Sequence, residues 1–246
     1  MQPEKKQLEV LIMHYLTEYC GIFPAGKLVP SESPDFILKI KKKFSIGIEL
    51  TRLNPLNAQL LNNIDLERDR IRDEIIDRAK TNFIQSSSLN LFVKFLFSDK
   101  TKINPESVLV FSARLTNLVR NAVKDKNSNS FFRETISNSS LPKGLDEVLI
   151  VHDPGLKSSI WERSNNLGVS ANIIDDIRET ILKKDENLVL YQKQQLNSYW
   201  LIITTDRLRG TKNSQLRNTI GNVLFHAHFE HVFLFDLMRA ECHKLV

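Results

Sequence analysis

The feature that most constrains this chain is a run of alternating apolar and polar residues near residue 50. Its apolar members alternate with small or polar ones: Phe44, Ile46, Ile48 and Leu50 against Ser45, Gly47, Glu49 and Thr51. Successive side chains of a β-strand point to opposite faces, so one face of this strand is apolar and is expected to be buried. The other face carries a single carboxylate, and its small neighbours are expected to leave room for a ligand.

A shorter alternating run precedes it, from Asp35 to Ile40, and the two runs predict a β-hairpin over 35–40 and 44–51. If Lys41–Lys43 form the turn, Ile40 pairs with Phe44, and counting back places Asp35 directly opposite Glu49. Directly opposed side chains have Cβ atoms about 4.5–5.5 Å apart, so the two carboxylates repel each other. A divalent cation such as Mg²⁺ relieves this repulsion, because it binds one or two carboxylates together with water and substrate phosphate. A slip by one residue would separate the pair.

These residues resemble a known family. Pro34-Asp35, followed after the basic turn by Glu49-x-Thr51 on the next strand, is similar to the motif of the PD-(D/E)XK, or restriction endonuclease-like, nuclease superfamily. The core of that family is a helix, a hairpin with the acidic pair, a helix and further strands in a mixed sheet. The motif resemblance covers only Glu9 to about Lys80.

The resemblance implies a metal site and names its ligands. Asp35 and Glu49 are the implied metal ligands, and the carbonyl group of Leu50 is expected to complete the site for Mg²⁺ or Mn²⁺. A glutamate on the first helix commonly assists in this family. Glu9 and Glu18 both flank the apolar stripe of that helix, and Glu9 is preferred as a catalytic residue.

One position departs from the family pattern. Thr51 stands where the family has a lysine, and threonine cannot supply positive charge to an attacking water or to the phosphate. Members of the superfamily move this lysine to a neighbouring element. Lys80, at an apolar edge of the helix expected after the hairpin, is the candidate catalytic substitute. Lys39 shares the face of Asp35, but four residues along a strand is about 13 Å, which is too far unless its side chain bends back.

Helices and short apolar strands alternate over the rest of the chain. Helices are expected over about 3–19, 61–84, 105–124 and 173–184, and strands over 89–97, 148–151, 199–204 and 231–235. This alternation is typical of an α/β domain with a sheet covered on both faces. With the resemblance, it predicts a single α/β domain, 1–246: a restriction endonuclease-like mixed sheet flanked by helices. The nuclease-like core is expected over about 1–125, with a C-terminal α/β extension over about 143–246.

Composition limits the remaining classes. The hydrophobic fraction of 41% excludes a disordered chain, and no apolar run approaches the roughly 20 residues of a membrane span. No secretory signal is recognised, so we expect a cytoplasmic protein with no membrane partner. Cys20 and Cys242 are expected to be free, buried or half-buried thiols in a reducing compartment. The net charge of +5, from 34 Lys and Arg against 29 Asp and Glu, is compatible with a polyanionic partner without proving one.

Two further groups of residues are weaker candidates. His226, His228 and His231 are close in sequence, but His231 falls on the other strand face, and ordinary residues before the last strand are the simpler interpretation. The segment from Arg207 to Arg217 is rich in basic residues and could contact a nucleic-acid backbone, although a solvated loop is the simpler interpretation.

We therefore predict a metal-dependent nuclease that hydrolyses phosphodiester bonds, with DNA as the expected partner. Two alternatives stay open: a catalytically degenerate nuclease-like fold that binds nucleic acid or protein, and an α/β partner-binding protein without a metal site. The degenerate fold is distinguished from the active nuclease by whether Lys80 or another basic residue approaches Asp35 and Glu49. The second requires Asp35 and Glu49 to lie apart or on different faces.

Overall fold

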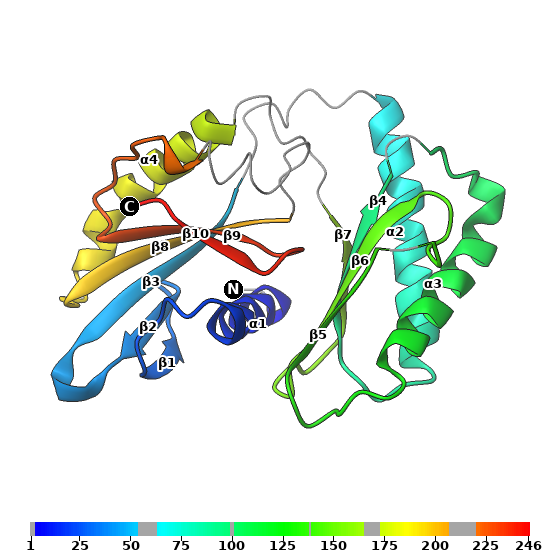
Figure 1. The fold of residues 1–246 in the computed structure, drawn as a ribbon, viewed down its shortest axis with the longest axis horizontal. Coiled ribbons are helices and arrows are strands. Elements are labelled where there is room, and N and C mark those ends of the chain that lie inside the picture. Colours follow the sequence, from blue (N-terminus) through cyan, green and yellow to red (C-terminus); the bar gives the residue numbers. More distant parts are fainter. Residues whose placement is uncertain (1–2, 54–62, 99–100, 138, 165–172, 207–219) are drawn as a thin grey trace. The chain divides into compact units, whose positions relative to one another are not determined.

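The computed structural model describes residues 3–53, 63–98, 101–137, 139–164, 173–206 and 220–246 (Figure 1). The chain forms two compact units. The first consists of Met1–Leu11 and Leu60–Asn165, and the second of Ile12–Gln59 and Asn166–Val246. We expected a single domain with a core over about 1–125 and a C-terminal extension over about 143–246. The boundaries of the two units differ from this division. Each unit is built from two stretches of chain, and the stretches of the two units alternate along the sequence.

The second unit contains a six-stranded mixed sheet. Its strands are β1 (Lys27–Pro30), β2 (Phe36–Lys39), β3 (Ser45–Arg52), β8 (Ser198–Thr205), β9 (His231–Asp236) and β10 (Glu241–Lys244). They lie in the order β1-β2-β3-β8-β9-β10. β1, β2 and β3 pair antiparallel, β3, β8 and β9 pair parallel, and β10 returns antiparallel to β9. Figure 1 shows the three parallel strands at the centre of the sheet.

The hairpin of β2 and β3 has the predicted register. Lys41–Lys43 form a single 3₁₀ turn, and the backbone N–H of Ile40 donates to the carbonyl oxygen of Phe44 at 2.8 Å. Phe36 then pairs with Ile48. Counting one pair further places Asp35 opposite Glu49, as the sequence predicted.

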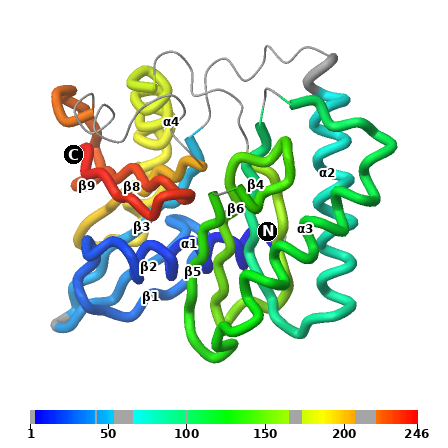
Figure 2. Tube along the Cα trace, turned by 45° about the vertical axis from the view of Figure 1, so that its right-hand side comes forward, coloured from blue at the N-terminus to red at the C-terminus, as the bar shows by residue number. Residues whose placement is uncertain are grey.

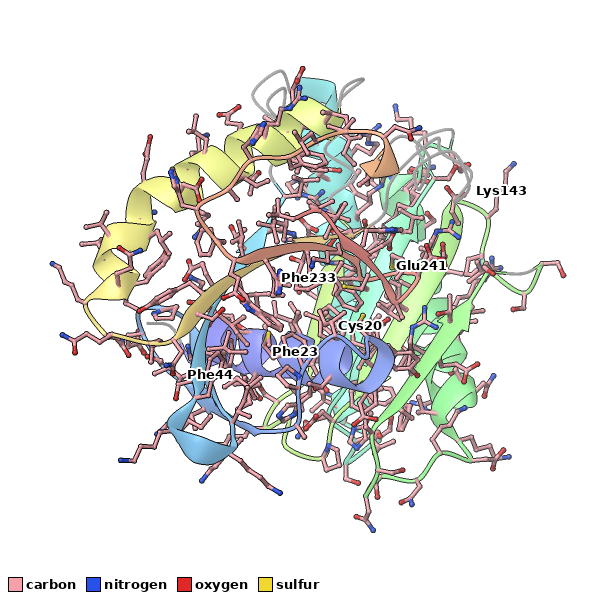
Figure 3. The ribbon with its side chains drawn as sticks, turned by 60° about the vertical axis from the view of Figure 1, so that its left-hand side comes forward. Cys20, Phe23, Phe44, Lys143, Phe233 and Glu241 are labelled. Carbon is pink, nitrogen blue, oxygen red and sulfur yellow. The ribbon has the colours of Figure 1, made fainter. Side chains whose placement is uncertain are left out.

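The predicted apolar face of the hairpin is largely buried. Phe36, Leu38, Ile46 and Ile48 are at most 4% exposed. Phe44 is an exception with 42% of its surface exposed, because it lies at the turn end of the hairpin, beyond the last strand pair (Figure 3).

Two helices cover the faces of this sheet. α4 (Ile173–Gln192) buries an apolar stripe against β8 and β9, where Ile177, Ile181 and Leu188 share a core with Leu201 and Leu234. Because Glu49 is the register partner of Leu201, it lies on this face, which we call the α4 face.

The opposite face is covered by the end of α1 (Pro3–Tyr19), of which residues 12–19 belong to the second unit. The ring of Tyr15 packs edge-on against Phe235 at 5.2 Å between centroids, and its hydroxyl donates to the carbonyl oxygen of Leu237 at 2.7 Å. We call this the α1 face.

The first unit contains the other sheet. Its elements are α2 (Asn63–Ile84), β4 (Phe92–Phe97), α3 (Val108–Val123, after a 3₁₀ turn over Pro105–Ser107), β5 (Phe132–Ile136), β6 (Leu145–His152) and β7 (Ile160–Arg163). The strand order is β5-β6-β4-β7, with β4 antiparallel to β6 and parallel to β7. α2 and α3 lie side by side (Figure 2), and share one core with alternate residues of β4 and β6, such as Phe95 and Ile150.

Both sheets are mixed and are flanked by helices, which confirms the α/β class. Within the described parts of the chain, no helix is both long and apolar enough to cross a membrane.

Candidate functional site

Asp35 and Glu49 lie side by side at the start of β2 and within β3. One carboxylate oxygen of Asp35 (Oδ2) accepts a hydrogen bond of 2.8 Å from the backbone N–H of Leu50, which fixes the Asp35 side chain beside β3. Glu49 is 6% exposed and Asp35 is half-buried. The hairpin therefore brings the two carboxylates together on the α4 face.

The structure supplies a lysine that the sequence reasoning missed. Lys184 of α4 places its Nζ 2.7 Å from Oε1 of Glu49. A buried carboxylate costs free energy unless a charge or hydrogen-bond donor compensates it. Lys184 supplies both to Glu49. It reaches Glu49 from a helix 135 positions further along the chain.

A sequence signal for Lys184 does exist. The buried residues of α4 recur at helical spacing, as Ile177, Ile181, Leu188 and Tyr191. Lys184 occupies the same stripe, between Ile181 and Leu188. A lysine inside an apolar helix stripe needs an acidic partner on the surface that the helix covers, and Glu49 is that partner.

Tyr191 also interacts with Glu49. It lies seven residues after Lys184, about two turns along the same helix face, and its side chain hydrogen-bonds Glu49. The pKa of Tyr191 is raised well above its usual value. Burial is the largest cause, followed by the charge of Glu49, this hydrogen bond and the charge of Asp35. The hydroxyl therefore stays protonated and acts as a donor, so Glu49 is held by two side chains of α4.

The space above Gly47 is filled by the protein itself. A Cβ atom at Gly47 would lie 2.8 Å from Cγ of Pro34 and 2.9 Å from Cδ1 of Leu196. The side-chain amide of Gln194, just after α4, donates to the carbonyl oxygen of Ser33. The expectation that small residues leave room for a ligand is therefore wrong at Gly47. The glycine instead allows the segment before Asp35 to pack closely against the end of α4.

The other predicted site residues are placed as follows. Lys80 on α2 and Glu9 on α1 both belong to the first unit, and their catalytic roles beside Asp35 and Glu49 stay predictions. Glu9 is paired instead with Lys5 and Lys6, at 3.6 and 3.3 Å.

Three further residues belong to the second unit. Two of them lie away from the acidic pair, and the third makes a different contact from the one expected. Glu18 is exposed on the part of α1 that covers the opposite face. Lys39 is exposed and pairs with Ser45 at the turn end of the hairpin, beyond the packed Gly47. For Leu50, the structure shows its N–H bound to Asp35, and the metal-binding role of its carbonyl group stays a prediction.

The acidic pair is the candidate for a metal site. In the described part of the chain, no group of three or more His, Cys, Asp or Glu side chains is arranged to hold an ion. Two carboxylates are nevertheless a donor set that Mg²⁺ uses when water and substrate phosphate supply the other ligands. Of the candidate histidines His226, His228 and His231, His228 pairs with Asp185 at 3.2 Å, whereas His231 packs against Trp200. The basic segment from Arg207 to Arg217 lies outside the described residues.

Comparison with known proteins gives no relative for this chain: no family model, no curated protein and no solved structure matches it.

Proposed function

We propose that the second unit carries a metal-dependent phosphodiesterase site, that of a nuclease acting on DNA, built on Asp35, Glu49 and Lys184. The observation that carries this proposal is the 2.7 Å contact between Lys184 Nζ and Glu49. It completes a set of two carboxylates and one lysine on one face of a sheet, which is the residue set that the resemblance of Pro34-Asp35 and Glu49-x-Thr51 implies.

The order of elements in the second unit supports the proposal. Its described elements run from the end of α1 through β1 and the hairpin β2–β3 to α4 and β8. The resemblance implies a helix, a hairpin with the acidic pair, a helix and a further strand. This order is met once residues 60–165 are set aside as an insertion between the hairpin and its helix.

The chemistry follows from the side chains. A bound Mg²⁺ or Mn²⁺ lowers the pKa of a water molecule and polarises a phosphate oxygen. Asp35 and Glu49 would hold the ion through their carboxylate oxygens, which the hairpin presents from opposed positions. Lys184, which is hydrogen-bonded to Glu49, would direct its positively charged ammonium group toward the water or the phosphate. Tyr191 fixes the orientation of Glu49, and the N–H of Leu50 fixes that of Asp35.

A second function, binding without catalysis, is favoured by one observation. Pro34 and Leu196 fill the space above Gly47, which closes one approach to the carboxylates. If the substrate cannot reach the pair from the remaining side, the unit serves as a nucleic-acid- or protein-binding module.

The test is a cleavage assay with plasmid, linear and single-stranded DNA and with RNA, in Mg²⁺, Mn²⁺ or EDTA. The wild-type protein runs beside Asp35→Asn and Glu49→Gln, which keep the side-chain shapes. We expect metal-dependent cleavage that falls at least about 100-fold in either variant, since loss of one electrostatic group in an active site costs roughly that much. Cleavage that survives both substitutions would refute this site. If no substrate is cut, calorimetric titration with Mn²⁺ distinguishes a binding module with a metal site from one without.

A further inference from the structure

The two cysteines come from opposite ends of the chain and meet on the α1 face of the second unit. Cys20 directly follows α1, and its backbone N–H continues the helix by donating to the carbonyl oxygen of Leu16 at 2.8 Å. Tyr15 anchors this end of α1 on Phe235. Cys242 of β10 is the register partner of Phe235, and paired residues point to the same face of a sheet.

Both thiols are free, and they are hydrogen-bonded to each other. This bond, followed by burial, raises the pKa of Cys20, and the same bond lowers the pKa of Cys242. Of the two sulfurs, Cys242 therefore loses its proton more readily and Cys20 holds its proton more tightly. Cys20 is 6% exposed, whereas Cys242 is only half-buried. The expectation of two free, buried or half-buried thiols is confirmed, but their contact was not foreseen.

We propose that Cys20 and Cys242 form a redox-active dithiol, which closes to an intramolecular disulfide by exchange with a low-molecular-weight disulfide such as oxidised glutathione. The site lies on the face of the sheet opposite to Glu49, so this inference is independent of the proposed nuclease function.

The two steps have distinct attacking groups. The Cys242 thiolate attacks one sulfur of the small disulfide, forms a mixed disulfide and releases one thiolate. Cys20 then loses its proton to solvent and attacks the Cys242 sulfur, which releases the second thiolate. The protein loses two protons and two electrons, and one small disulfide is reduced to two thiols. The half-exposed, thiolate-stabilised cysteine attacks first because reactivity follows thiolate character and access.

The cross-link has a structural consequence. Among the described strands, β10 lies at the edge of its sheet and pairs with β9 alone, through the four pairs from Glu241 to Lys244. A bond from Cys242 to Cys20 ties this edge to the end of α1. It also closes a loop that contains nearly all of the second unit, and closing a long loop restricts the unfolded chain most. We therefore expect slower amide exchange in β10 and a higher Tm in the oxidised protein.

The test incubates the full-length reduced protein with oxidised glutathione, quenches with an alkylating reagent, and analyses intact mass and mobility on a non-reducing gel. Wild type should lose two hydrogens, migrate faster as a monomer, and revert with dithiothreitol. Cys20→Ser should stop at one glutathione adduct on Cys242, whereas Cys242→Ser should react at least tenfold more slowly. Both variants should react equally fast after unfolding in urea, which controls for the reagent.

A pH series separates this mechanism from simple proximity of two cysteines. Cys20→Ala removes the donor of the hydrogen bond that favours the Cys242 thiolate, so the rate of the first step should reach its half-maximum at higher pH in Cys20→Ala than in wild type. Cys20→Ser keeps a hydroxyl donor at this position and is the matched control, with a smaller shift expected. Disulfide-linked dimers, the absence of an internal disulfide, or equal native reactivity of Cys20 and Cys242 would overturn the proposal.

Discussion

The ion pair between Glu49 and Lys184 supports a quantitative prediction that needs no assumption about function. The two charges are 2.7 Å apart, and their side chains are 8% and 24% exposed. At an effective dielectric constant of 20, charges at this distance attract by about 6 kcal/mol before desolvation is subtracted. Desolvation offsets much of this gain, and removal of one partner from a fully buried pair costs about 3–5 kcal/mol. Because Lys184 keeps some exposure, we expect Lys184→Met to lower the free energy of unfolding by about 2–3 kcal/mol.

A double-mutant cycle isolates the interaction. It combines Lys184→Met with Glu49→Gln and should give a coupling free energy of about 1–3 kcal/mol. The chain offers a matched control on the same helix: Lys183 pairs with Glu179 at 2.6 Å, but its side chain is 70% exposed. An exposed i, i+4 pair contributes only about 0.3–0.5 kcal/mol, so the control cycle should give a coupling several-fold smaller.

The assay is urea unfolding monitored by tryptophan fluorescence. The two tryptophans fall in different units, Trp161 in the first and Trp200 in the second. A Trp161→Phe background leaves Trp200 as the reporter of the unit that holds the ion pair. Equal coupling in the two cycles, or a coupling below about 0.3 kcal/mol for Glu49 and Lys184, would refute the placement of Lys184 over the acidic pair.

Three further predictions concern residues around the site. Gly47→Ala should destabilise the second unit by about 1–3 kcal/mol, measured by the same urea assay, because its Cβ would lie 2.8 Å from Pro34; an unchanged midpoint would contradict the packing at this glycine. Tyr191→Phe should weaken Mn²⁺ binding several-fold in calorimetry, since Glu49 loses one of its two orienting donors; identical binding would show that the hydroxyl does not orient Glu49. Lys80→Ala should leave metal-dependent cleavage within about twofold of wild type, because Lys184 already supplies the lysine of the proposed site; a loss comparable with Glu49→Gln would show that Lys80 contributes to the site.

The part of the candidate site that depends on local pattern was predictable from the sequence. Alternation fixed the faces of β2 and β3, and the basic turn Lys41–Lys43 fixed the count between Asp35 and Glu49. A hairpin joins neighbours in sequence, so no long-range information was needed. The pattern missed the exposure of Phe44, because alternation does not show where a strand pair ends. It also missed the close packing at Gly47, because that depends on Leu196, which is distant in sequence.

The partner of Glu49 was not predictable in the same way. β3 pairs with β8, although residues 60–165 of the first unit separate the two strands in the sequence. Periodicity carries no information about which later helix covers a given strand. The assumption that the next helix covers the hairpin led to Lys80, whereas α2 packs in the core of the first unit. The one sequence signal for Lys184 is its position within the apolar stripe of α4.

The strands that the sequence did not predict share a physical cause. β1, β5, β7 and β10 are the four edge strands of the two sheets. Edge strands pair on one side only and tend to be short and partly polar, so they lack the apolar runs that identified β4, β6, β8 and β9. The cysteine contact was missed for the same reason, since Cys242 lies on one of these strands.

The claim that Lys184 completes a catalytic site with Asp35 and Glu49 is tested most directly by cleavage kinetics of one matched pair of variants. Lys184→Met and Lys183→Met change adjacent lysines of α4, and only the first contacts Glu49. In saturating Mg²⁺ with the DNA that the wild type cuts best, the account predicts a loss in kcat of about 100-fold or more for Lys184→Met. Lys183→Met should stay within about twofold of wild type. Equal rates for the two variants, with wild-type activity that EDTA abolishes, would contradict the account and place the catalytic lysine elsewhere.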